Sequence, residues 1–128
     1  MAWKRTRIGL RMAMRPPNPC RGEIWMAGLD PVRGHEQGGT RPCLVISVDP
    51  FNRIPSGVVV VVPLTSRQRN IPSHVEVNPP DGGLQIRSFI RCEDIRCISQ
   101  ERLTARRGVV SDATIARVEQ RLRLILGL

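Results

Sequence analysis

Arg41 is the residue of this sequence whose surroundings best suit chemistry on a phosphate. It follows Gly38-Gly39-Thr40 and precedes Pro42 at the expected opening of a strand. Glycines let backbone approach a phosphate closely, and a residue before proline is driven into an extended conformation. A guanidinium fork can hold two phosphate oxygens at once. An arginine that only flanks a hairpin turn would look the same, so both interpretations stay open on this pattern alone.

The other catalytic chemistries are poorly represented. No CxxC pair occurs, and His35 and His74 do not complete a zinc spacing. There is also no Ser-His-Asp arrangement. Cleavage of RNA remains available, because the 2′-hydroxyl of the substrate can be the nucleophile. The protein then supplies positioned groups for proton transfer and for the charge on the phosphorane. We therefore predict neither a metal site nor a cofactor.

The charge of the chain is basic but unevenly distributed. The formal net charge is +9, and Lys4 is the only lysine among the 20 basic residues. Five basic residues and no acid lie in residues 1–20, whereas residues 21–128 carry 15 basic and 11 acidic side chains. A basic surface suits RNA or an acidic protein partner, although genomic base composition alone can also enrich arginine. We predict one domain over residues 21–128, preceded by a disordered tail, an over-extended gene start or an RNA-gripping arm.

Cysteine usage and hydropathy indicate the compartment. The four cysteines carry no disulfide-like spacing, and free thiols fit a reducing cytoplasm. No segment approaches the ~20 apolar residues that span a membrane. Arg11 interrupts the apolar part of the N-terminus, so a secretory signal is not expected. The prediction is a cytoplasmic protein with no membrane contact.

The remaining pattern predicts a mainly β fold with one helix, of the α+β class. Aromatic residues make up only 3%, so Val, Ile and Leu must build the core, and β-branched residues favour strands. Ser111 is a good helix N-cap, and Gly127 fits just past the helix end. A small curled sheet or barrel packed by a C-terminal amphipathic helix follows. The expected strands are 22–28, 42–48, 58–62 bounded by Pro63, 74–77, 84–92, 95–98, and 103–110 broken by Gly108.

Several motifs together resemble MazF/PemK-type toxins over roughly residues 21–128. Their joint occurrence in this order is far more specific than any one of them. They are Arg21-Gly22-Glu23-Ile24-Trp25, Leu29-Asp30-Pro31, Gly34 to Pro42 with Gly-Gly-x-Arg-Pro, Leu44 to Ser47, Asn52-Arg53, Val62-Pro63-Leu64-Thr65-Ser66, Pro72 to Val77, Gly83-Leu84, Ile95-Arg96 and Glu101-Arg102-Leu103.

The resemblance implies an SH3-like small β-barrel, a homodimer, and metal-independent, sequence-selective cleavage of single-stranded RNA. The family's catalytic arginine and threonine fall on Arg41 and Thr65, although a strand-end threonine is also commonly structural. The implied products are a 2′,3′-cyclic phosphate and a 5′-hydroxyl. Such a toxin of a type II toxin–antitoxin system inhibits translation and growth, and an acidic antitoxin covers its RNA groove.

Other residues are weaker RNA-binding predictions. They are Glu36, Gln37, Gly39, Ser66, Arg67 and Arg69. A solvated loop charge, a local turn bond and plain surface charge are the competing interpretations for Glu36, Ser66 and the two arginines. We expect Trp25 in the core and both histidines in structural or peripheral positions. Asp94 and Arg87 depart from the residues frequent in the family, which affects the expected base preference or dimer contacts.

Two other functions compete with the ribonuclease. The first is a non-catalytic toxin on the same fold that acts through a protein interface, as gyrase poisons do. Retention of both Arg41 and Thr65 in their motifs disfavours it. The second is an SH3-like peptide-binding module, which lines its groove with aromatic side chains. Two Trp, two Phe and no Tyr make such a groove hard to build.

Overall fold

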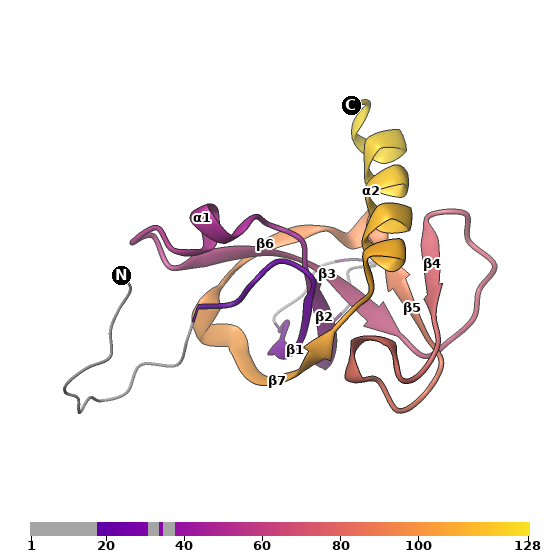
Figure 1. Cartoon of the computed structure of the whole chain (residues 1–128), viewed down its shortest axis with the longest axis horizontal. Helices are drawn as coiled ribbons and strands as arrows, with labels where there is room; N and C mark the ends of the chain where they lie inside the picture. The colour runs from indigo at the N-terminus through magenta and orange to yellow at the C-terminus, as the bar shows by residue number, and fades with distance from the viewer. Residues whose placement is uncertain (1–17, 31–33, 35–37) are drawn as a thin grey trace.

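A computed structural model of the chain describes residues 18–30, 34 and 38–128. Seven strands and a C-terminal helix dominate it (Figure 1). The elements are β1 (Glu23–Gly28), β2 (Thr40–Val45), α1 (Asp49–Asn52), β3 (Val58–Thr65), β4 (His74–Val77), η1 (Asp81–Gly83), β5 (Ser88–Arg91), η2 (Cys92–Asp94), β6 (Arg96–Ser99), η3 (Gln100–Arg102), β7 (Leu103–Val109) and α2 (Asp112–Leu126). Within the described part of the chain, no helix has both the length and the apolar character needed to cross a membrane.

The strands form one curled antiparallel sheet in the order β4-β5-β3-β2-β1-β7. β6 pairs with the first half of β3, and β5 pairs with its last two residues. The long strand β3 therefore belongs to two parts of the sheet, and α2 stands beside β4 and β5 (Figure 1). The prediction of a small SH3-like barrel with a C-terminal helix is confirmed, although the described strands do not close into a full ring.

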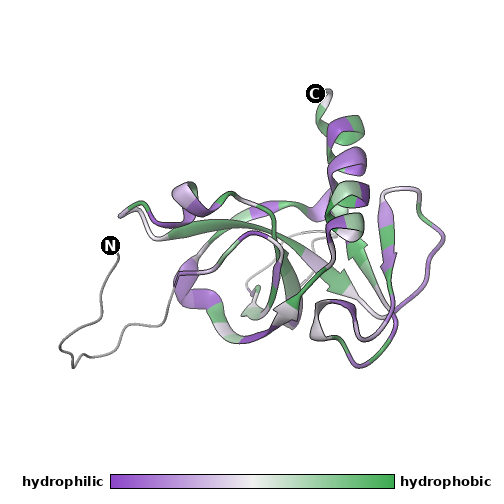
Figure 2. Ribbon diagram, viewed as in Figure 1, coloured by the Kyte–Doolittle hydropathy of each residue, from purple (hydrophilic) through white to green (hydrophobic). Residues whose placement is uncertain are grey.

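Alternation along the strands builds two apolar cores, one on each face of the sheet. Successive side chains of a strand point to opposite faces, so neighbouring residues of β1, β2 and β3 enter different cores. One core packs against α2 and includes Ile24, Leu44, Val62, Leu64, Ile90, Val118 and Leu122. The other lies inside the curl and includes Trp25, Cys43, Val45, Val59, Val61 and Ile98. Figure 2 shows β3 hydrophobic along most of its length. The prediction that Trp25 lies in the core is confirmed.

The predicted C-terminal helix and both its caps are confirmed. The Ser111 hydroxyl accepts a hydrogen bond from the Thr114 amide at 3.2 Å, and Gly127 ends the helix at φ 72°. The Asp81 carboxylate accepts from the Ser111 amide at 2.7 Å and from the Thr114 hydroxyl at 2.6 Å. The start of α2 is thereby tied to η1.

The predicted end of the valine strand at Pro63 is wrong, because β3 continues to Thr65. On one side β3 pairs with β6 as far as Val61 and with β5 only from Leu64. Pro63 lies between these two partners, where its missing N–H costs no ladder bond. β2 likewise begins two residues earlier than predicted, at Thr40, and ends at Val45.

The predicted strand over residues 84–92 is also wrong in its first half. Only Ser88–Arg91 is a strand, and an irregular link from Leu84 to Arg87 precedes it. The predicted break at Gly108 does not occur, because β7 runs through this residue to Val109.

The described end of the predicted tail is attached to the domain. Pro19 is buried, and its carbonyl accepts a hydrogen bond from the Asn52 carboxamide at 3.0 Å. The Cys20 amide donates to the Glu23 carboxylate at 2.8 Å. Residues 1–17 lie outside the described part of the chain, and the boundary at residue 20 stays a prediction.

Candidate active site

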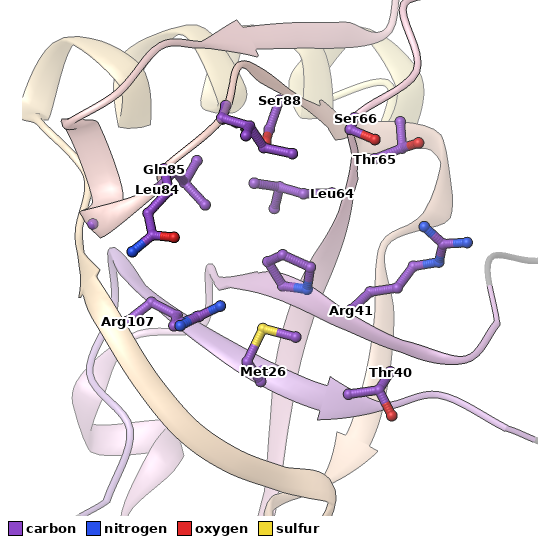
Figure 3. A pocket seen from close by; sticks show the side chains of 13 residues that line it. Met26, Thr40, Arg41, Leu64, Thr65, Ser66, Leu84, Gln85, Ser88 and Arg107 are labelled. Carbon is purple, nitrogen blue, oxygen red and sulfur yellow. Dashed lines mark hydrogen bonds between the residues drawn. The ribbon is translucent and has the colours of Figure 1, made fainter.

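A cavity of about 330 Å³ opens between the ends of β2 and β3, the link that precedes β5, and β7. Arg41, Thr65 and Ser66 lie on one side of it in Figure 3, and Gln85 and Arg107 lie on the other. The structure therefore places Arg41 and Thr65, predicted from two separate motifs, at one site.

The register of the central strands explains why these two residues meet. β2 and β3 are antiparallel neighbours in which Cys43 pairs with Pro63. Arg41 lies two residues before Cys43, and Thr65 lies two residues after Pro63. Continuing the antiparallel register by two residues therefore places Arg41 opposite Thr65. Since residues two apart share a face of a strand, both side chains reach the same end of the sheet.

Arg41 is oriented by the loop that precedes its strand. Its Nε donates to the Gly38 carbonyl at 2.7 Å. The loop is held in turn by the Asp30 carboxylate, which accepts from the Gly39 amide at 3.1 Å, and by the Leu29 amide, which donates to the Gly39 carbonyl at 2.9 Å. No carboxylate of the described residues forms an ion pair with Arg41. Its terminal nitrogens therefore remain available to an anionic ligand.

Thr65 presents a hydroxyl that already accepts one hydrogen bond. The side chain is 6% exposed, and its Oγ1 accepts a hydrogen bond from the Arg67 amide at 3.2 Å. A hydroxyl that accepts in this way keeps its own proton to donate. The adjacent Ser66 is exposed at the cavity. A bound phosphate would thus meet a guanidinium and up to two hydroxyl donors.

Cys43, two residues after Arg41 on β2, is not a suitable nucleophile. Cys43 is fully buried, and its burial raises the pKa of the thiol to about 12, although Arg96 and Arg41 act in the opposite direction. At neutral pH the thiol is protonated, and a protonated thiol is a weak nucleophile. His74 does not line the cavity and pairs with Glu93 at 2.9 Å.

The other predicted RNA-binding residues are placed as follows. Gly39, Arg67 and Arg69 do not line the cavity, although Gly39 supports the loop before Arg41 and both arginines are exposed just after β3. Glu36 and Gln37, together with His35, lie outside the described residues.

The two residues that depart from the family pattern are engaged in pairs. Arg87 donates from its Nε to Glu76 at 2.7 Å and lies 5.2 Å from the centroid of the Phe89 ring. Asp94 pairs with Arg91 at 2.9 Å. Neither residue lines the cavity.

Gln85 and Arg107 were not predicted as site residues. Gln85 was missed because it was expected within the strand 84–92, whereas it belongs to the irregular link before β5. A signal for Arg107 was present in the sequence. Arg106 and Arg107 are consecutive in the expected strand 103–110, where side chains normally alternate between faces. In the structure the pairing of β7 with β1 shifts register at Arg107. Arg107 lines the cavity, whereas Arg106 pairs with the Glu23 carboxylate at 2.7 Å.

Taken together, these features define a small, mainly β protein with an open cavity suited to a phosphodiester. Two arginines that form no ion pair with a described residue and the hydroxyls of Thr65 and Ser66 line the space, together with apolar side chains such as Leu64. In the ranges 18–30, 34 and 38–128, no three residues of the His, Cys, Asp and Glu types form a cluster that could hold a metal ion.

Comparison with known proteins gives the family. The family model described as "PemK-like, MazF-like toxin of type II toxin-antitoxin system" matches residues 20–126. Endoribonuclease MazF9 of Mycobacterium tuberculosis is 41% identical over 113 residues, which cover 84% of this chain and 96% of that protein. The chain therefore belongs to the PemK-like, MazF-like toxin family.

Solved structures agree with this assignment. The crystal structure of MazF from Deinococcus radiodurans superposes with a TM-score of 0.80 at 26% identity, covering 88% of this chain and all of that one. An endoribonuclease in complex with its cognate antitoxin, from Mycobacterial species, superposes with a TM-score of 0.71 at 30% identity, covering 86% and 96% of the two chains.

Proposed function

We propose that this protein is the toxin of a type II toxin–antitoxin system and an endoribonuclease that cuts single-stranded RNA at the Arg41–Thr65 end of the cavity. The observation that carries the proposal is the meeting of these two side chains, with unpaired donors, at one open site. The endoribonuclease activity is that of the relative 41% identical over 84% of the chain. We also propose a cytoplasmic location, which an RNA substrate and the four free cysteines support.

The proposed reaction uses the 2′-hydroxyl of the substrate. Its oxygen attacks the adjacent phosphorus as its proton is lost, the bond from phosphorus to the 5′-oxygen breaks, and the leaving oxygen takes up a proton. The products are a 2′,3′-cyclic phosphate and a 5′-hydroxyl. Arg41 stabilises the charge that develops on the phosphorane, and Thr65 donates a hydrogen bond to a phosphate oxygen. A guanidinium keeps its proton at neutral pH, which suits charge stabilisation better than proton abstraction.

Incubation of the purified toxin with long structureless RNA in excess EDTA tests this function. We expect discrete cuts that survive EDTA and leave 5′-hydroxyl ends. Thr65→Ser should retain most of the activity because it keeps the hydroxyl. Thr65→Val has a similar volume but lacks the donor, and it should cut on the order of 10²-fold more slowly. Circular dichroism checks that both variants fold.

If folded, antitoxin-free toxin cut none of a varied set of RNAs, the proposed endoribonuclease activity would be contradicted. The non-catalytic toxin that acts through a protein interface would then be favoured. Cuts that EDTA abolishes would instead contradict the metal-independent reaction.

We further propose that the toxin is a homodimer whose RNA site is covered by an acidic segment of a cognate antitoxin. A basic, open cavity would attract such a segment, and the mycobacterial relative was solved with its antitoxin. Light scattering of the free toxin should give about twice 14.3 kDa. Co-expression with the product of the neighbouring gene should relieve growth inhibition, and continued inhibition would rule out that product as the antitoxin.

A further inference from the structure

The far side of the cavity carries two polar side chains for which the proposed reaction has no use. Gln85 and Arg107 face the cavity across from Arg41 (Figure 3). Both side chains are exposed, and neither makes a hydrogen bond or an ion pair with another described residue. Arg106, the neighbour of Arg107 on β7, does not line the cavity and pairs with Glu23. The cavity thus has a second group of free donors and acceptors.

A close approach of two backbones holds this second group together. A Cβ added at Gly83 would lie 2.1 Å from the carbonyl oxygen of Arg107, and one added at Gly108 would lie 2.8 Å from the Gly82 backbone. Only glycines allow η1 and β7 to lie this close. Since Gln85 follows Gly83 by two residues, the contact brings its side chain beside Arg107. The pair is therefore built by the fold and does not depend on a mobile surface loop.

Between the two polar groups the cavity is apolar. Met26 and Leu64 lie between Arg41 on one side and Arg107 on the other in Figure 3. Ile86, which is 62% exposed, also lines the space. A planar apolar ligand with polar edges would fit such surroundings, whereas a tetrahedral, fully solvated anion would gain nothing from them.

We propose that Gln85 and Arg107 form a nucleobase-binding subsite that reads the base next to the scissile phosphate. This inference rests on the proposed function, because the phosphate bound at Arg41 fixes where the next base lies. Arg107 would donate to two acceptors on one base edge, and the Gln85 carboxamide would both donate and accept. Bases of single-stranded RNA are recognised on their edges in this way.

The chemistry of Gln85 favours a base over a second phosphate. A phosphodiester offers only acceptors, so the Gln85 carboxamide oxygen would find no partner on it. A nucleobase offers donors and acceptors on one edge and an apolar face to Met26 and Leu64. Arg107 alone could serve either ligand, and the carboxamide beside it decides between them.

Cut-site profiling on a long structureless RNA tests the subsite. Wild type, Gln85→Ala, Arg107→Ala and Arg107→Lys are compared, and sequencing of the ends gives the base preference at each position around the cut. We expect all three variants to lose about tenfold or more of the preference at one shared position beside the cut. Preferences at the other positions should stay unchanged. Arg107→Lys keeps the charge but loses the planar fork, so it should fail in the same way.

Arg106→Ala is the matched control, since it removes the same charge from the adjacent residue of β7, which does not line the cavity. It should keep the wild-type profile. A uniform slowing of all cuts by Arg107→Ala, with a smaller salt dependence of binding, would identify a phosphate contact and overturn the subsite. An unchanged profile in folded variants would overturn it as well, while leaving the ribonuclease intact. If the wild type cuts no RNA, the proposed function fails and this inference fails with it.

Discussion

Replacement of Arg41 by alanine is expected to lower the single-turnover rate of RNA cleavage by about 10²–10³-fold. Arg41 is the one cation beside Thr65 at this end of the cavity within the described residues, and no carboxylate there competes for it. Removal of its guanidinium withdraws the group that meets the charge developing on the phosphorane. Arg41→Lys should recover only part of the rate, because an ammonium keeps the charge but cannot hold two oxygens at once.

The single-turnover rate is measured with saturating enzyme and a short RNA that contains one mapped cut site. Under these conditions the rate reports the cleavage step and not the affinity for RNA. Fluorescence anisotropy on a non-cleavable RNA should show a much smaller loss of affinity than of rate. Arg123→Ala, on the exposed side of α2, is the charge-matched control and should cut at the wild-type rate. A folded Arg41→Ala variant that cuts within a few-fold of wild type would remove Arg41 from the reaction.

The elements that sequence patterns predicted well are those fixed by local chemistry. Ser111 and Gly127 bound α2 as expected, because a cap depends on its own side chain and on the backbone within a turn. The strand expected over the valine run at 58–62 is present as the first part of β3, because β-branched residues favour strands. His74–Val77 alternates between partly exposed and buried residues as predicted.

The errors in the predicted strand bounds occur where the conformation of a segment depends on the strand that pairs with it. β3 continues through Pro63 because, on one side, β6 pairs with β3 only as far as Val61 and β5 pairs with it only from Leu64. The sequence of β3 alone does not indicate where these two pairings lie. The link from Leu84 to Arg87 carries strand-like residues. It has no strand partner, because β3 and β4 pair with β5 only from Ser88 onward. Before it, Gly83 contacts the backbone of Arg107, 24 residues further along the chain.

The residues of the candidate site also differ in whether the sequence could predict them. Arg41 was predicted as a phosphate-binding candidate from its flanking residues, whereas Thr65 was predicted only from the family resemblance. The sheet register then supplies a physical reason for their meeting. Gln85 and Arg107 could not be paired from the sequence, because their proximity depends on the contact of Gly83 with the backbone of β7.

Replacement of Gly83 by alanine is expected to lower the free energy of unfolding by about 3–5 kcal/mol, among the larger effects of a single substitution. Two costs combine. Gly83 has φ +71°, where a non-glycine residue costs roughly 1–2 kcal/mol. The added Cβ would also lie 2.1 Å from the Arg107 carbonyl oxygen, so η1 and β7 must separate. Urea denaturation measures the loss as a lower midpoint at constant slope.

Gly57→Ala isolates the first cost, because Gly57 has nearly the same φ, +72°, and beyond its chain neighbours the nearest atom to an added Cβ is the Pro55 carbonyl oxygen at 3.9 Å. It should lose only about 1 kcal/mol, and the difference between the two variants then measures the close approach. If Gly83→Ala still folds at low temperature, the walls that carry Gln85 and Arg107 have moved apart. Its base preference should then relax at the same position as in Arg107→Ala, while cleavage at the Arg41 end persists. Equal destabilisation by the two variants would mean that the contact between η1 and β7 contributes nothing to the fold.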